Sequence, residues 1–147
     1  MAKKFRFSLQ SVLGHREHLR EQAQIALSHR LAIVEKLLGE KKILEEEQAE
    51  QVRQRPNQGS GEMMMRSLAY MATLKKALEV NAKQLEDGHN EVAKARLALV
   101  EKDRDVRAME ILRDQQRETF HKQGLVLETK LLDDFGSMRA LRAEGAT

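Results

Sequence analysis

The chain has 147 residues, of which 33% are charged and 3% are aromatic, with one proline and no cysteine. This composition is typical of long helices and provides little from which to build a globular core, and the lack of cysteine excludes a disulfide framework or a thiolate metal site. The formal net charge is +3, and acidic and basic residues are interspersed, so the sequence does not favour binding to nucleic acid.

The apolar runs are far shorter than the ~20 residues needed to cross a bilayer, the longest being Leu31 to Val34 and Leu97 to Val100. No signal peptide begins the sequence. We therefore expect a soluble, intracellular protein.

A first helix is expected from about Ser8, whose hydroxyl can act as an N-cap, to about Gln54. Its apolar residues recur at spacings of three and four, which predicts one apolar face. The residues of this face are Leu9, Val12, Leu13, Leu19, Ala23, Ala26, Leu27, Ile33, Val34, Leu37 and Leu44. The pattern fades after Leu44, so we expect the end of this helix nearest the turn to be the weaker one.

A turn is expected at about residues 55–61, which include Pro56 and the glycines Gly59 and Gly61. Pro56 disfavours a helical conformation at the residue before it, which ends the first helix. Ser60 or Gly61 can cap the helix that follows.

A second helix is expected from about residue 62 to as far as 141, with an apolar residue at every seventh position. A strict seven-residue repeat predicts a left-handed coiled coil. The repeat comprises Met64, Met71, Leu78, Leu85, Val92, Leu99 and Val106, then Phe120 and Leu127 after a miss at Arg113. The second inward position alternates between Leu74, Ala95 and Met109 and the less suitable Asn81, Gly88, Lys102 and Gln116. We therefore predict an all-α fold, a long antiparallel two-helix coiled-coil hairpin that forms one domain over residues 1–147.

The second helix is expected to outrun the first by roughly thirty residues at 1.5 Å per residue. Its final apolar residues would then be partly uncovered and would mark a docking surface, unless Phe5 and Phe7 fold back over some of them. These residues are Phe120, Leu125, Val126, Leu127, Leu131, Leu132, Phe135, Met138 and Leu141. We also expect kinks or fraying at Gly124 and Gly136.

No pattern of residues indicates catalysis. His15 and His18 stand one helical turn apart without a third metal ligand, and the adjacent Asp133 and Asp134 diverge on a helix. We therefore expect no catalytic, cofactor or metal site, and no enzymatic activity.

The amino-terminal pattern Phe-basic-Phe-x-Leu-x-x-Val-Leu-x-x-Arg, at Phe5 to Arg16, resembles the flagellar export protein FliJ family. The resemblance extends to an acidic, aromatic ending at Glu128 to Phe135. It implies an antiparallel coiled coil that enters the pore of the hexameric export ATPase, promotes ring assembly and couples the ATPase to export. It also implies contact with the cytoplasmic domain of the membrane export gate, and a cytoplasmic location held at the inner face of the membrane by these partners.

The family contacts the gate through an aromatic, leucine, alanine and histidine stripe on the second helix. Here Tyr70, Leu74, Ala77 and Asn81 fall on that spacing, with Asn81 in place of the histidine. Leu74 also fits the coiled-coil core, so both roles stay open for it. For the ATPase ring we expect contacts through Phe5, Phe7, Val12, Arg16 and Phe135. Export chaperones are further candidate partners, and the free protein is expected to be a monomer.

A second interpretation is a coiled-coil scaffold at a membrane or cytoskeletal surface. Such a scaffold would be a parallel homodimer that holds anionic lipid through its basic first twenty residues. Binding to nucleic acid is disfavoured because the sequence has few aromatic residues on which bases could stack.

Overall fold

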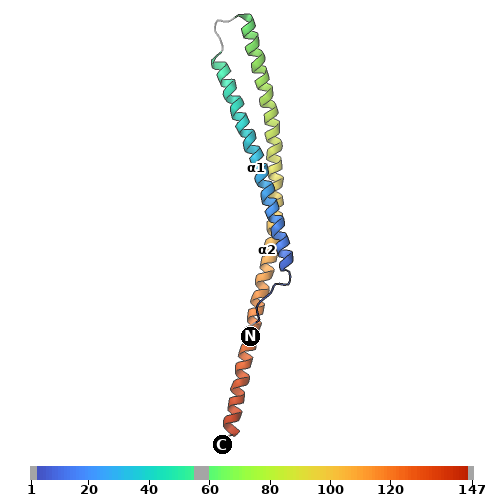
Figure 1. Cartoon of the computed structure of the whole chain (residues 1–147), viewed down its shortest axis with the longest axis vertical. Coiled ribbons are helices and arrows are strands. Elements are labelled where there is room, and N and C mark those ends of the chain that lie inside the picture. The colour runs from blue at the N-terminus through green and yellow to red at the C-terminus, as the bar shows by residue number, and fades with distance from the viewer. Residues whose placement is uncertain (1–2, 55–59, 146–147) are drawn as a thin grey trace. The chain divides into compact units, whose positions relative to one another are not determined.

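The computed structural model of the chain describes residues 3–54 and 60–145, and these form two long helices, α1 (Gln10–Arg53) and α2 (Gly61–Gly145) (Figure 1). No strand occurs among these residues, so the predicted all-α fold is confirmed. The turn expected around Pro56 lies outside the described residues. Neither helix, over the ranges described, contains a segment long and apolar enough to cross a membrane.

Local hydrogen bonds show how the helices begin. At the start of α2, the Met63 amide donates to the Ser60 hydroxyl oxygen at 3.3 Å and the Met64 amide donates to the Ser60 carbonyl at 3.1 Å. Ser60 is therefore the N-cap, one of the two residues predicted for it. At α1 the helix begins at Gln10, two residues after Ser8, and the Gln10 amide donates to the Phe7 carbonyl at 3.1 Å.

α2 continues through Gly124 and Gly136, where we expected kinks or fraying. Neither glycine adopts a positive φ. A single glycine costs a helix only about 1 kcal/mol, which good helix formers on both sides can offset.

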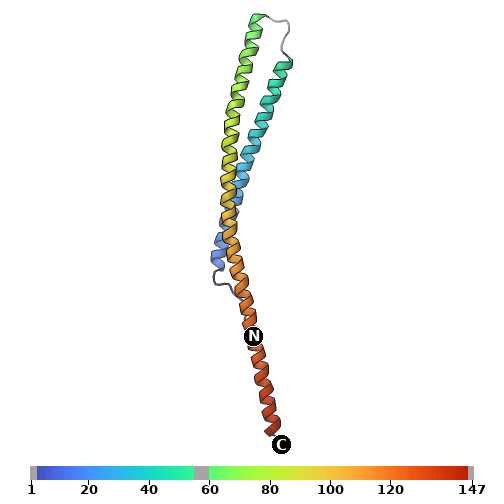
Figure 2. The ribbon, with the colours of Figure 1, turned by 180° about the vertical axis from the view of Figure 1, so that it is seen from behind.

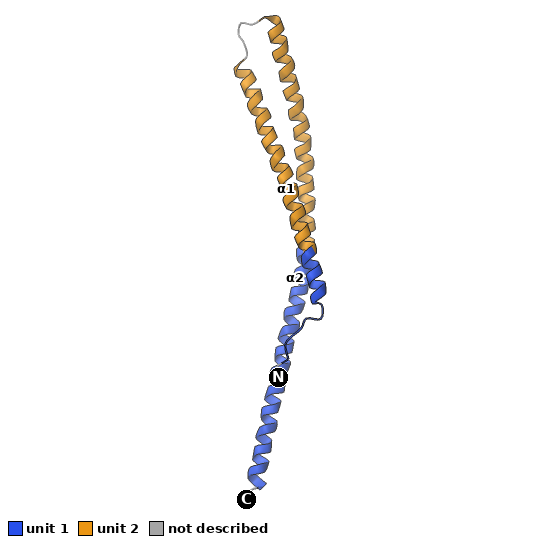
Figure 3. Ribbon diagram, in the orientation of Figure 1, with its two compact units in different colours: residues 1–18, 103–147 blue, residues 19–102 orange. Residues whose placement is uncertain are grey.

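The chain divides into two compact units, which Figure 3 colours separately. Unit 1 comprises Met1–His18 and Asp103–Thr147, and unit 2 comprises Leu19–Lys102. Each unit has its own small core.

In unit 2, α1 and α2 pack antiparallel around a core of Val34, Leu85 and Val92, against which Leu27 and Leu37 also pack. The predicted seven-residue repeat supplies Leu85 and Val92. Gly88 lies between them on the second inward position, and a Cβ atom built there would be 3.0 Å from Val34 Cγ2. The glycine thus permits a close approach of α1, and a methyl group at this position would crowd the Val34 side chain.

Hydrogen bonds between α1 and α2 in unit 2 also follow the antiparallel arrangement, since earlier residues of α2 pair with later residues of α1. The Asn81 side-chain amide donates to the Leu37 carbonyl at 3.0 Å, and the Tyr70 hydroxyl donates to Glu47 Oε1 at 2.9 Å. Asn81 is only 3% exposed, and its Oδ1 atom has no hydrogen-bond partner among the residues that the structure describes. A buried amide satisfied on one side fixes the register of two helices at a cost in stability.

In unit 1, the non-helical residues 3–9 run beside α2, and we call them the N-terminal strap. Phe7 from the strap, Leu13 from α1, and Val106 and Met109 from α2 form the core of this unit. Phe5 and Leu112 pack against it. Leu13 and Val106 are completely buried.

Three positions of the seven-residue repeat, Leu85, Val92 and Val106, therefore pack in cores formed within the chain. A parallel homodimer would need these side chains to face a second molecule. Phe5 and Phe7 do fold back on α2, as one of our two alternatives expected. Residues 121–145 are nevertheless exposed throughout.

Candidate functional site

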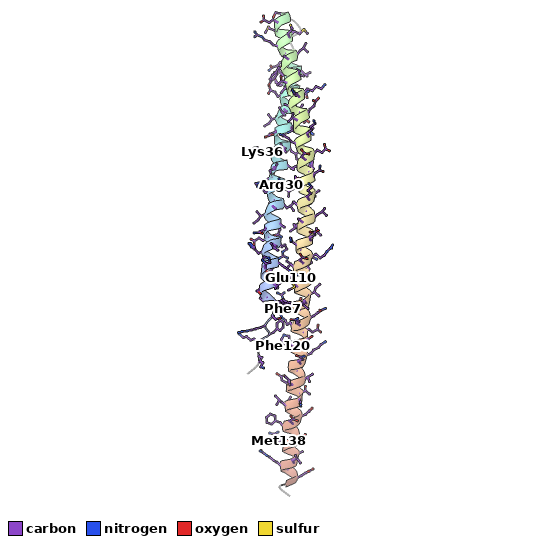
Figure 4. All side chains as sticks on the ribbon, turned by 90° about the vertical axis from the view of Figure 1, so that its right-hand side faces the viewer. Phe7, Arg30, Lys36, Glu110, Phe120 and Met138 are labelled. Atoms are coloured by element: carbon purple, nitrogen blue, oxygen red, sulfur yellow. The ribbon has the colours of Figure 1, made fainter. Side chains whose placement is uncertain are left out.

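The N-terminal strap is held to α2 by aromatic and cationic contacts. The rings of Phe5 and Phe120 pack at 5.7 Å between centroids and are tilted by 54°. The Arg117 guanidinium lies 5.7 Å from the centroid of the Phe5 ring, a cation–π arrangement. In Figure 4, Phe7 lies beside α2 just above Phe120.

All five residues expected to contact an ATPase ring belong to unit 1. Four of them lie together at the strap and the start of α1. Phe7 is buried, and Arg16 donates from Nη1 to the Asp105 carbonyl at 3.3 Å. Phe5 is half-buried, and Val12 is 39% exposed. Phe7 and Arg16 therefore hold the strap and α1 to α2, whereas Val12 and one edge of Phe5 remain accessible.

A groove of about 550 Å³ runs along this strap. Its lining combines apolar side chains with basic and amide side chains. Its lining includes Phe5, Arg6, Leu112, Gln116, Thr119 and Phe120. A groove of this kind is suited to a protein segment rather than to a reaction that must exclude water.

Phe135, the fifth residue, lies further along α2 and is well exposed. It belongs to a row of apolar side chains at helical spacing, which we call the C-terminal stripe. The stripe comprises Leu127, Leu131, Phe135 and Met138, each more than half exposed. Figure 4 shows Met138 on a stretch of α2 beside which no other described segment lies. The C-terminal stripe continues the α2 face that the strap covers at Phe120, and within residues 3–54 and 60–145 no segment covers it.

The four residues expected to contact an export gate lie in unit 2 and have different environments. Tyr70 is 40% exposed and Ala77 is half-buried, whereas Leu74 and Asn81 are buried by α1. The hydrogen bond to Glu47 raises the pKa of Tyr70 above its ordinary value, with smaller contributions from desolvation and from the negative charge of that carboxylate. While α1 and α2 are paired, only Tyr70 and Ala77 of these four residues can be reached by a partner.

Sequence analysis missed Glu47, the hydrogen-bond partner of Tyr70, and Arg117, which covers Phe5. Glu47 could have been found, because it and Tyr70 are almost equidistant from the predicted turn and an antiparallel pair places such residues side by side. No signal in the sequence pointed to Arg117, since it depends on where the non-helical strap settles.

Among residues 3–54 and 60–145, no group of three or more histidine, cysteine, aspartate or glutamate side chains is arranged to hold a metal ion. His15 and His18 lie on α1 within unit 1. The residues brought together in this chain are apolar, aromatic and cationic groups of the kind found at protein interfaces.

Comparison with known proteins gives one finding. A model of the family described as Flagellar FliJ protein matches residues 5–145. No curated protein and no solved structure matches the chain.

Proposed function

The chain belongs to the flagellar FliJ protein family, which acts in flagellar protein export, and from this premise we propose a specific arrangement of partners. Unit 1 binds the hexameric export ATPase, promotes assembly of its ring and couples it to export. The middle of α2 binds the cytoplasmic domain of the export gate. The protein has no enzymatic activity of its own, is a monomer when free, and is held at the inner face of the cell membrane through these partners. Export chaperones are additional candidate partners.

The C-terminal stripe is the observation that carries this proposal. Leu127, Leu131 and Phe135 stand one turn apart on one face of α2, and each is more than half exposed. Exposed apolar side chains gathered on one face stabilise a complex when a partner covers them, and aromatic side chains such as Phe135 are enriched at protein interfaces. Val12 and the groove beside Phe5 extend the accessible surface of unit 1.

For the export gate, the burial of the four candidate residues divides their roles. We assign direct contact to Tyr70 and Ala77, which remain accessible. Leu74 and Asn81 pack under α1 and position that edge of α2.

Point variants of the full chain test the ATPase assignment without removing the core of unit 1. We expect the double variant Leu131→Ser, Phe135→Ser to bind the isolated ATPase at least about tenfold more weakly, a loss of about 1.4 kcal/mol. The matched control is Leu125→Ser, Leu132→Ser, which removes two equally exposed leucines from a different face of the same helix. Equal losses in both variants, or no loss in the first, would refute the C-terminal stripe as the binding surface.

A second pair of measurements separates the two partners. Tyr70→Ala is expected to weaken binding to the isolated cytoplasmic domain of the gate and to leave ATPase binding unchanged. The stripe variant should show the reverse pattern. If either variant lost binding to both the ATPase and the gate domain, the proposed division of surfaces would be wrong.

A further inference from the structure

The end of unit 2 nearest the turn carries apolar side chains that neither helix covers. We call this surface the tip patch, and it comprises Val52, Met63, Met64, Met65 and Leu68, each about half exposed or more. Figures 1 and 2, which view the chain from opposite sides, both show α1 and α2 diverging toward Arg53 and Gly61. Met64 occupies a core position of the seven-residue repeat, yet it is 48% exposed where Leu85 is 7% exposed.

The antiparallel register brings the residues of the tip patch to one level. The hydrogen bond between Tyr70 and Glu47 pairs those positions across the two helices. Five residues further toward the turn on each helix, Val52 is level with Met65, and so with its neighbour Met64. Leu68 follows Met64 by one turn of α2, so it lies on the same face. Val52, Met64 and Leu68 therefore lie near one level of the two helices, and Met63 and Met65 flank Met64 on α2.

Two properties of the tip patch define the chemistry of what would bind it. Three of its five side chains are methionines, which are unbranched and adapt to differently shaped apolar partners. The charge around it is negative, because in residues 43–54 and 60–70 carboxylates outnumber guanidinium groups. The acidic residues are Glu45, Glu46, Glu47, Glu50 and Glu62.

The two cations in these ranges are already paired within their own helices. Arg53 Nη2 lies 3.0 Å from Glu50 Oε2, and Arg66 Nη2 lies 3.1 Å from Glu62 Oε1. The tip thus offers an adaptable apolar surface with an excess of negative charge.

We propose that the tip patch binds a basic amphipathic α-helix of a partner protein. The apolar face of that helix lies on Val52, Met64 and Leu68, and its lysine or arginine side chains face the α1 carboxylates. A methionine-rich surface with an acidic surround is suited to this mode of recognition. A second copy of this chain would bring like charges together, and an anionic membrane would be repelled. The proposal is independent of the ATPase and gate assignments above, which use other residues.

The test uses the full chain and two labelled peptides of equal length. One peptide places leucine on one helical face and lysine on the other, and the second replaces every lysine by glutamate. We expect saturable binding of the lysine peptide by fluorescence anisotropy, weakening as salt is raised, and no binding of the glutamate peptide.

Variants then locate the site. Met64→Ser, Leu68→Ser is expected to weaken binding of the lysine peptide at least about tenfold, and Glu46→Gln, Glu50→Gln to weaken it and reduce its salt dependence. The matched control is Leu131→Ser, Phe135→Ser, which removes two exposed apolar side chains from the C-terminal stripe and should bind the peptide as the parent chain does. Val52→Ser is a milder second variant on the other helix, and circular dichroism checks that each variant keeps its helices.

Three results would overturn the proposal. These are equal binding of both peptides, unchanged binding by both the Met64, Leu68 variant and the Val52 variant, or a greater loss in the C-terminal stripe control than in the tip variants.

Discussion

The core of unit 1 contains two side chains with no exposed surface, Leu13 and Val106, beside Phe7 at 8% and Met109 at 6%, whereas Val34, Leu85 and Val92 in the core of unit 2 each keep 6–7%. Both cores form between the same two helices, so sequence periodicity alone does not account for the difference. In unit 1 a third element, the N-terminal strap, adds Phe7 to the core. Two helices shield best the line along which they touch, and in unit 1 the strap adds a third segment beside that line.

The largest effect should distinguish the two cores directly. Leu13→Ala is expected to lower the free energy of unfolding by about 4 kcal/mol and Leu85→Ala by about 2 kcal/mol, because the more deeply buried side chain loses more contacts. Chemical denaturation followed by circular dichroism measures both. Leu97→Ala, at a position 69% exposed, should change little. Equal costs at Leu13 and Leu85 would contradict the comparison.

The strap itself can be removed from the core of unit 1 by Phe7→Ala, which we expect to cost about 3 kcal/mol. In that background the cost of Leu13→Ala should fall by about 1 kcal/mol, because the two side chains share one core. A double-mutant cycle measures this coupling, with Phe135→Ala as the exposed aromatic control. Strict additivity would show that the strap does not support the burial of Leu13.

Unit 2 should become more stable when its buried amide is replaced. Asn81→Leu removes an Oδ1 atom without a partner and is expected to raise the free energy of unfolding by about 1 kcal/mol. Loss of the bond to the Leu37 carbonyl should also weaken the preference for one register. Asn90→Leu, on the exposed side of α2, is the control. A destabilised Asn81→Leu variant would show that the hydrogen bond outweighs the unpaired oxygen.

Two glycines of α2 separate helix propensity from packing. Gly124→Ala meets nothing within 4 Å and should stabilise the helix by about 1 kcal/mol. Gly88→Ala places a methyl group against Val34, whose branched side chain cannot easily rotate away, so we expect a net loss of up to about 1 kcal/mol. Thermal unfolding of the two variants should therefore shift in opposite directions, and shifts in the same direction would argue against close packing at Gly88.

The smallest effect concerns pH at the tip of unit 2. Because Tyr70 is the only tyrosine, the absorbance of tyrosinate reports its pKa alone. That pKa is raised above the ordinary value of tyrosine, so the protonated form is favoured in the folded chain. The contact with Glu47 is therefore intact at lower pH and is lost as pH rises through the folded pKa. Glu47→Ala should return the pKa toward the ordinary value. A pKa that does not change in this variant would show that the bond does not control titration.

The sequence predicted the helical architecture and many of the inward positions, because residues that recur every seven positions lie on the side of the helix that faces a partner helix. Leu85, Val92 and Val106 are buried as the repeat requires. Periodicity carries no information on how far apart the two helices lie. For that reason Met64 was expected in the core but is half exposed, and Gly88 was interpreted as a weak position although it lies close to Val34 of α1.

The candidate site was less predictable. The packing of Phe5 and Phe7 on α2 was one of two alternatives, suggested by the need to cover apolar surface. Their partners, including Arg117, depend on the path of a non-helical segment. The four residues expected to contact the export gate, from Tyr70 to Asn81, have the spacing of one helix face. Spacing does not reveal that α1 already occupies half of that face.

The approach of α1 at Gly88 also makes this protein suitable for an engineered covalent lock. The Cβ built at Gly88 is 3.0 Å from the Val34 γ-carbon, close to the separation that a disulfide requires between one Cβ and the opposite sulfur. Because the chain contains no cysteine, the pair Val34→Cys and Gly88→Cys would form a single, unambiguous crosslink. Reversible oxidation of that pair would then fix or release the two helices of unit 2 at a chosen moment, and partner binding could be compared in the two forms of one sample.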